Sequence, residues 1–222
     1  MVLILKKEGF MDNTAIVLQG PVEYAEQIVD CYSHVKKNVI ISTNLIKKDQ
    51  KEILEDNKFL VKKAPTPTHA GKYNFNNQVA TTYNGVVTAK KMGFEHVLKL
   101  RSDIMIDDVV NFVSKLDRSS VYFSARHNHA RMSYLCEHML FGSTDFMVKL
   151  WNIPESQSYE GPEIQLTRKF YSITKSYDDV KFLFPVLYKN EIEARWIKYK
   201  KDLREFKKDE KFTYDTKNMS AM

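Results

Sequence analysis

The triplet Arg101-Ser102-Asp103 contains a guanidinium, a hydroxyl and a carboxylate, which are groups that can take part in ligand binding or catalysis. Residues 96–100 before it form a short apolar pattern typical of a buried strand, which would place the triplet at the strand's carboxyl end. A carboxylate there can hold a divalent cation that offsets negative charge on phosphate groups. We therefore expect Asp103 to bind Mg²⁺ or Mn²⁺. Either further ligands of the ion come from elsewhere, or Arg101 partly substitutes for it. The alternative is that Asp103 caps a turn.

Polar residues also follow two earlier predicted strands. Residues 14–18 are followed by Gln19-Gly20-Pro21, and residues 38–42 end in Ser42-Thr43. Ligands of parallel sheets bind beyond the carboxyl ends of the strands, so we expect these side chains near Asp103. Gly20-Pro21 could instead form a turn with proline at the first helical position, and Ser42 or Thr43 could cap the next segment.

Three further residues are candidates because of their surroundings. Asn76 and Gln78 start a predicted helix, where their amides could bind a nucleotide or sugar, although Asn76 is also a good N-cap. Lys99 alternates with leucines on the strand that precedes Asp103. An inward-facing base is costly unless it is paired, so we expect a phosphate or carboxylate partner for Lys99.

The elements that must position these residues alternate along the first half of the chain. Apolar runs at 14–18, 38–42, 59–62 and 96–100 are separated by helical patterns, including a long one from Asn76 to Gly93. This order predicts an α/β fold with a mostly parallel, mixed sheet flanked by helices. We expect one domain over residues 1–211, a frayed tail over 212–222, and a last helix from Asn190 to about Lys208.

Five short motifs resemble the WavE-type lipopolysaccharide-synthesis family. They are AIVLQGP at 15–21, the strand end at Ser42-Thr43, NFNNQ at 74–78, KLRSD at 99–103 and, more loosely, FGSTD at 141–145. The resemblance covers residues 14 to about 108 well and implies a GT-A-like fold that moves a sugar from a nucleotide-sugar donor to a glycan or lipid-linked glycan. It places Gln19, Gly20, Pro21, Ser42, Thr43, Asn76, Gln78, Lys99, Arg101 and Ser102 at the donor and Asp103 at the metal. Asn77 departs from the family, which usually has Arg there.

Glycosyl transfer with inversion needs a base that deprotonates the acceptor hydroxyl. Glu163, in the sequence GPEIQL, is our candidate because it resembles the acidic acceptor-side motif of inverting GT-A enzymes. The alternative is a structural role, because the helix dipole favours a glutamate in the first turn and proline is common at the first helical position. Glu137 and Asp145 are weaker candidates.

The composition excludes several classes of protein. Hydrophobic residues make up 43% and charged residues 28% of the 222 residues, which is typical of a folded chain. No apolar run approaches the roughly 18 to 20 residues of a membrane span. Two cysteines give no disulfide framework, so we expect a cytoplasmic protein. The sequence contains no G-x-G-x-x-G, P-loop or G-x-S-x-G motif.

A histidine-rich pattern could bind a metal. His127, His129, Cys136 and His138 could supply four zinc ligands, but their spacing is unusual for zinc. We expect a polar loop that lines the acceptor site, and solvated surface histidines are the alternative.

A basic pattern defines a rival function. The basic face of the predicted last helix, with Arg195, Lys198 and Lys201, could contact donor phosphates or an anionic membrane. One alternative is therefore a non-catalytic basic module for nucleic acid or an anionic surface; another is a sugar nucleotidyltransferase. We expect no nucleic-acid partner.

Overall fold

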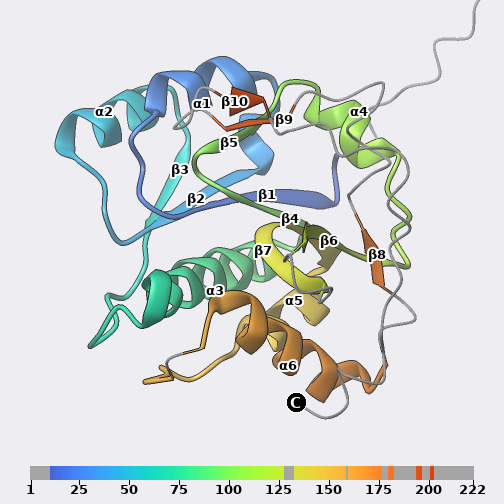
Figure 1. The fold of residues 1–222 in the computed structure, drawn as a ribbon. Coiled ribbons are helices and arrows are strands. Elements are labelled where there is room, and N and C mark those ends of the chain that lie inside the picture. The colour runs from blue at the N-terminus through green and yellow to red at the C-terminus, as the bar shows by residue number, and fades with distance from the viewer. Residues whose placement is uncertain are drawn as a thin grey trace, which may run out of the picture.

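The computed structural model describes residues 11–127, 133–158, 160–176, 180–182, 194–196 and 201–202. Its main sheet has seven strands in the order β3-β2-β1-β4-β7-β6-β8. Four of the six neighbouring pairs are parallel, and β7 is antiparallel to both β4 and β6. The expected fold class, a mostly parallel mixed α/β sheet flanked by helices, is confirmed (Figure 1).

Six strands of this sheet have three to seven residues, and β7 has eleven. The strands are β1 (Thr14–Gln19), β2 (Val39–Thr43), β3 (Leu60–Lys63), β4 (His96–Arg101), β6 (Val121–His127), β7 (Ser133–Ser143) and β8 (Val180–Phe182). The helices are α1 (Ala25–Tyr32), α2 (Lys48–Asp56), α3 (Phe75–Lys91), α4 (Val109–Ser114), α5 (Thr144–Trp151) and α6 (Pro162–Thr174), with short 3₁₀ turns η2 (Ser33–Asn38) and η3 (Lys72–Asn74). None of these described helices is long and apolar enough to cross a membrane.

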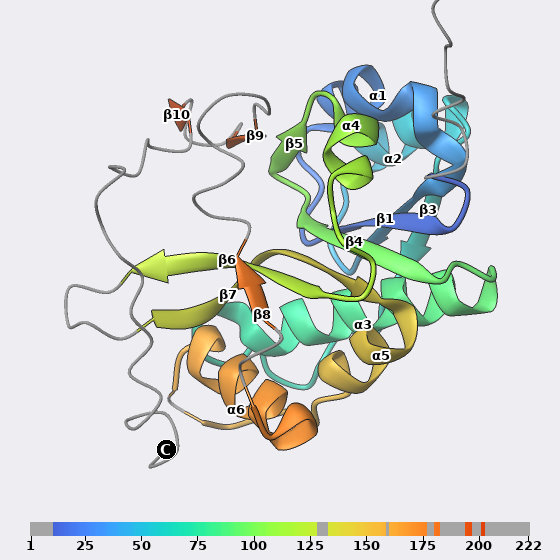
Figure 2. The same ribbon diagram turned by 90° about the vertical axis from the view of Figure 1, so that its right-hand side faces the viewer.

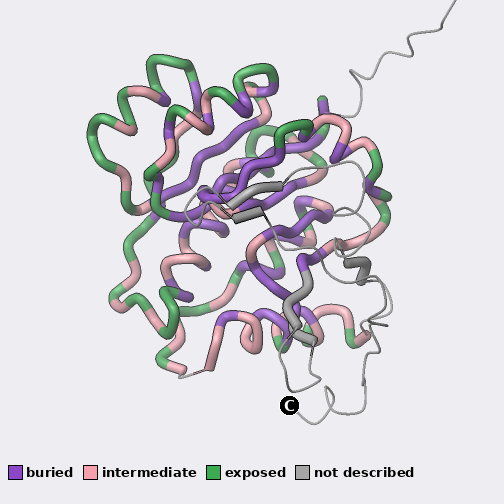
Figure 3. Tube along the Cα trace, turned by 45° about the horizontal axis from the view of Figure 1, so that its top comes forward, coloured by how far each residue is buried: buried purple, intermediate pink, exposed green. Residues whose placement is uncertain are grey.

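The helices form two layers, one on each face of the sheet (Figure 2). Side chains alternate along β1, so that Ile16 and Leu18 pack toward α1, α2 and α4, whereas Ala15 and Val17 pack toward α3, α5 and α6. The central strands are accordingly buried along their length (Figure 3). Two cores on opposite faces therefore fix β1 and β4, whose carboxyl ends carry the candidate residues.

The predicted last helix is wrong. Ala194–Trp196 forms strand β9 and Lys201–Asp202 forms strand β10, in a small sheet of order β10-β9-β5, where β5 is Ile104–Ile106. The helical spacing of Ile192, Trp196 and Tyr199 suggested a helix, but β9 pairs antiparallel with β5 and takes its conformation from that partner. The other residues of that stretch and the 212–222 tail lie outside the described residues.

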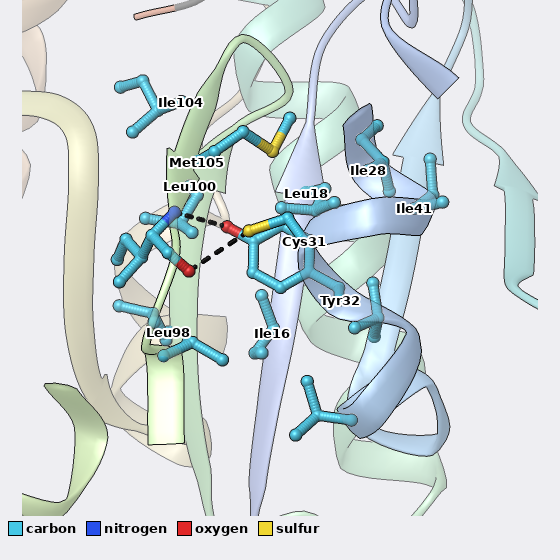
Figure 4. Packing of buried hydrophobic residues seen from close by; sticks show 14 of the residues in the cluster. Ile16, Leu18, Ile28, Cys31, Tyr32, Ile41, Leu98, Leu100, Ile104 and Met105 are labelled. Carbon is cyan, nitrogen blue, oxygen red and sulfur yellow. Dashed lines mark hydrogen bonds between the residues drawn. The ribbon is translucent and has the colours of Figure 1, made fainter. Parts of the chain in front are cut away.

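Strand β5, which follows Asp103 directly, is attached to α1 by two hydrogen bonds (Figure 4). The Ile106 N–H donates to the Tyr32 hydroxyl over 3.0 Å, and the Cys31 thiol donates to the Ile106 carbonyl over 3.2 Å. Tyr32 is fully buried, and burial raises the pKa of its phenol, so it stays protonated. These bonds satisfy both backbone groups of Ile106 and fix the chain just beyond the candidate site.

Replacing Tyr32 by Phe is expected to lower the free energy of unfolding by roughly 1 to 2 kcal/mol, because the Ile106 N–H loses its partner in a buried place. Urea denaturation followed by circular dichroism measures this change. Tyr73→Phe is the matched control, since Tyr73 is 70% exposed. Equal stability of Tyr32→Phe and the wild type would show that this hydrogen bond contributes nothing.

Candidate active site

A cleft of about 460 Å³ opens at the carboxyl ends of β1 and β4. The chain runs from β1 outward to β2 and β3 on one side and returns to place β4 on the other side of β1, so the strand order reverses at this pair. Ligands of open α/β sheets bind at such points. Seven of the predicted site residues line the cleft: Gln19, Gly20, Pro21, Gln78, Arg101, Ser102 and Asp103.

Arg101 and Asp103 form a bidentate ion pair at the floor of this site. The Nε and one terminal nitrogen of Arg101 donate to the two oxygens of Asp103 over 2.9 and 2.7 Å. The side chain of Asp103 is 11% exposed and that of Arg101 is 28% exposed. Two parallel bonds between planar groups hold both in one orientation, so the carboxylate is positioned by the guanidinium.

The loop after β1 lies against the loop after β4. The Ser102 N–H donates to the Gln19 carbonyl over 2.8 Å, and the Ser102 hydroxyl donates to the Pro21 carbonyl over 2.5 Å. Gly20 has a φ of +116°, and a Cβ there would lie 3.3 Å from the Ser102 oxygen. Glycine is therefore required at this turn both for its conformation and for the close approach.

The opposite wall is the start of α3 and the turn before it. Gly71, Tyr73 and Asn74 all have positive φ, which is an uncommon conformation for the last two. Asn77 accepts a 2.5 Å hydrogen bond from the Asn44 amide. The cleft also includes Glu23, Tyr24, Asn44, Tyr73 and Asn74, which sequence reasoning missed because no local signal shows that a turn or a left-handed residue will face a strand end.

Two residues that line the cleft each have a buried amide oxygen with no hydrogen-bond partner within the described part of the chain. These oxygens are Oε1 of Gln19 and Oε1 of Gln78. The amide nitrogen of Gln78 donates to the Tyr73 carbonyl over 3.1 Å, which fixes the orientation of that side chain. Buried acceptors are normally satisfied, so both oxygens are suited to a ligand that brings hydroxyl or N–H donors.

Three predicted donor-binding residues, Ser42, Thr43 and Asn76, do not line the cleft. Ser42 is fully buried and accepts a 3.0 Å bond from the Asn84 amide, and the Thr43 hydroxyl donates to the Leu45 carbonyl over 2.8 Å. The amide nitrogen of Asn76 donates to the Ser156 carbonyl and its oxygen accepts from the Ser156 N–H, both over 3.0 Å. Their polar groups are used to connect elements of the fold.

Lys99 is likewise not a cleft residue. It is fully buried, its Nζ donates to the Glu137 carbonyl, and it lies 5.3 Å from the centre of the Trp151 ring. Burial lowers the pKa of Lys99 to about 7. A phosphate or carboxylate partner was expected, but this inward-facing base contacts a backbone carbonyl and an aromatic ring, with the Glu137 carboxylate close by.

Glu163 occupies the first turn of α6, as the sequence predicted, but it does not line the cleft. It lies near the rim, because a Cβ placed on Gly161 would be 3.2 Å from the Glu163 carboxylate and 4.0 Å from the Tyr73 ring. The structure thus brings Glu163 toward the site without bringing it to Asp103. Its role as a base stays a prediction.

The residues of the cleft fit a divalent cation that arrives together with phosphate groups. The lining carries the carboxylates of Glu23 and Asp103 and the guanidinium of Arg101, hence one net negative charge. Mg²⁺ and Mn²⁺ are typically held by one or two carboxylates plus substrate phosphates, and each Asp103 oxygen has a second lone pair beyond its bond to Arg101. Asp103, with Glu23 nearby in the lining, would hold the ion.

Comparisons with known proteins leave the family open. No protein-family model matches the sequence, and no curated protein matches it significantly. The structure is similar to a mannose-1-phosphate geranyltransferase from Thermus thermophilus, with 7% identity over 77% of this chain and 73% of that chain and a TM-score of 0.45. It is also similar to a glycosyltransferase involved in the glycosylation of the major capsid of PBCV-1, with 15% identity over 76% and 81% and a TM-score of 0.44.

A third similar structure is a cytidylyltransferase from Leptospira borgpetersenii serovar Hardjo-bovis, with 12% identity over 65% of this chain and 66% of that chain and a TM-score of 0.37. Similarities this distant assign no activity. The WavE-type resemblance stays a prediction, and the function has to be argued from the site itself.

Proposed function

We propose that the chain is a glycosyltransferase that binds a nucleotide-diphosphate-sugar in the cleft and transfers the sugar to a glycan or lipid-linked glycan. The observation that carries this proposal is the convergence of the Arg101–Asp103 pair with the partnerless amide oxygens of Gln19 and Gln78 in one cleft. A nucleotide-sugar offers phosphates to Arg101 and to a cation held by Asp103, and sugar hydroxyls or base N–H groups to the amides.

The residues of the cleft have different roles in donor binding. Arg101 orients Asp103 and lies beside the phosphates, while the rings of Tyr24 and Tyr73 provide flat surfaces for the base. The bound cation would offset the charge that grows on the diphosphate as the glycosidic bond breaks. No base for the acceptor hydroxyl is assigned, because Glu163 lies outside the lining.

The two rival functions have less support from the described residues. A sugar nucleotidyltransferase is expected to have a glycine-rich basic loop after its first strand, but residues 20–24 contain Glu23 and no cation. The basic binding module relied on a C-terminal helix, and residues 194–196 and 201–202 are strands instead. Glycosyl transfer is therefore the function that we put forward.

Thermal unfolding against a panel of nucleotide-sugars, each with Mn²⁺ and with EDTA, tests the proposal. One donor is expected to raise the midpoint by roughly 5 to 10 °C at a hundredfold excess over Kd, and EDTA is expected to remove the increase. Nucleoside triphosphates with sugar 1-phosphates belong in the same panel. A larger increase with that mixture would favour nucleotidyl transfer, and no increase with any donor in a folded sample would contradict both activities.

A further inference from the structure

Strand β7 contains an irregularity that brings together residues not used by the proposed site. Its pairing with β6 passes from Phe123↔Leu140 to Ser124↔Cys136, so that Glu137, His138 and Met139 form a bulge of three residues. In a regular strand, neighbouring side chains point to opposite faces, and three consecutive residues cannot converge. The bulge removes this restriction for Cys136, Glu137 and His138.

The three side chains converge on one small volume. Their ligating atoms all lie within 4.8 Å of one another. Nε2 of His138 lies 3.3 Å from one Glu137 oxygen, and Sγ of Cys136 lies 3.8 Å from the other. Ligands of a tetrahedral zinc ion, with bonds of about 2.0 to 2.3 Å, are separated by roughly 3.3 to 3.8 Å. The separations of 3.3 and 3.8 Å, each to a different oxygen of Glu137, lie within this range.

The backbone of the bulge is held in place from both neighbouring strands. The Ser124 hydroxyl on β6 donates to the Cys136 carbonyl and accepts from the Met139 N–H, both over 3.2 Å. From β4, Lys99 donates to the Glu137 carbonyl and so holds the backbone. The Glu137 carboxylate contacts Cys136 and His138. Outer contacts of this kind orient the ligands at metal sites.

Burial and charge also suit a soft divalent cation. Cys136 is 2% exposed and Glu137 is 3% exposed, while the side chain of His138 is 19% exposed and leaves a route to the solvent. A thiolate and a carboxylate together carry two negative charges, which one divalent ion neutralises within the buried site. Sulfur, nitrogen and oxygen donors together select zinc over Mg²⁺ or Ca²⁺, which prefer oxygen alone.

We propose that Cys136, Glu137 and His138 bind one zinc ion, separate from the cation expected at Asp103. Three protein ligands leave a fourth position for water or another small ligand. This site does not include Glu23, Arg101 or Asp103, so it can exist whether or not the cleft binds a nucleotide-sugar. Cys136 and His138 were among the four zinc ligands that the sequence could supply, whereas Glu137 was considered only as a base and becomes a ligand because of the bulge.

The test is metal binding by the full chain, purified without chelators, then stripped and reloaded. Elemental analysis after dialysis against zinc is expected to give about one zinc ion per chain. Reloading with Co²⁺ is expected to give a thiolate-to-cobalt charge-transfer band in the near ultraviolet, a signal that an ion held only by oxygen ligands at Asp103 cannot produce. Asp103→Asn is expected to keep this band.

Cys136→Ser is expected to abolish the band, and His138→Gln to weaken zinc binding at least tenfold. Cys31→Ser is the matched control, since Cys31 is the other buried free cysteine and is expected to leave both signals unchanged. A folded wild-type chain that retains no zinc overturns the proposal, and so does a band that persists in folded Cys136→Ser. The wild-type measurement decides the question even if a variant fails to fold.

Discussion

Asp103→Asn is expected to weaken binding of the nucleotide-sugar donor in the presence of Mn²⁺ by about a hundredfold, to the level that the wild type shows in EDTA. Asparagine keeps the size of the side chain and one of the two oxygens that accept from Arg101, although its amide nitrogen cannot accept the second bond. It removes the carboxylate charge that would hold the cation. Isothermal titration calorimetry with and without EDTA measures the effect.

The same substitution distinguishes two roles of Asp103, because the two roles predict opposite changes in the affinity for the donor. If Asp103 only pairs with Arg101, Asp103→Asn takes the lining from one net negative charge to none and strengthens the binding of an anionic donor. Tighter binding in Mn²⁺ would therefore contradict metal binding by Asp103. Asp145→Asn is the matched control, because that carboxylate also pairs with a cation, Lys90 at 2.8 Å, but lies outside the cleft.

Gly85→Ala is expected to destabilise the protein by about 3 kcal/mol, although the same change in an ordinary helix stabilises by up to about 1 kcal/mol. Gly85 lies in α3 where the helix touches β1 and β2. A Cβ there would lie 2.4 Å from a Val17 methyl group and 3.0 Å from Cβ of Ser42. The helix that carries Asn77 and Gln78 would have to move away from the sheet. Chemical denaturation gives the change in free energy.

Two further variants identify the clash as the cause. Val17→Ala removes the methyl group at 2.4 Å, so the double variant is expected to be more stable than the sum of the two single changes predicts. Gly142→Ala is the control, since its nearest neighbour would be at 3.6 Å, an ordinary contact. A stabilised Gly85→Ala protein would show that α3 has room at this point.

The sequence predicted the elements whose apolar residues repeat with one clear period. Residues 14–18 and 96–100 were expected as strands, and the structure has Thr14–Gln19 and His96–Arg101. Their ends are defined by a change from apolar to polar residues, which is why Gln19, Arg101 and Asp103 were expected together and do line one cleft. Local patterns fail where a distant partner decides the conformation, as β5 does for Ala194–Trp196.

The sequence does not show whether a polar side chain binds a ligand or another part of the protein. Lys99 and Asn76 have the residue types of ligand contacts, but both are buried with protein partners that lie 38 and 80 positions away in the sequence. Conversely, Tyr73 faces the cleft from a left-handed turn. Neither the partner of a buried polar group nor a positive φ at a non-glycine residue has a local sequence signal.

The pairing of β1 with β4 aligns Gln19 with Arg101. Because side chains alternate along strands, deleting one residue within either strand would turn its terminal polar group to the opposite face, among the apolar side chains under α1 and α4. The loop at 64–71 lies outside the strands and can change length without this inversion. Natural variation in length should therefore occur in that loop, where it can alter the choice of substrate while the ends of β1 and β4 keep their alignment.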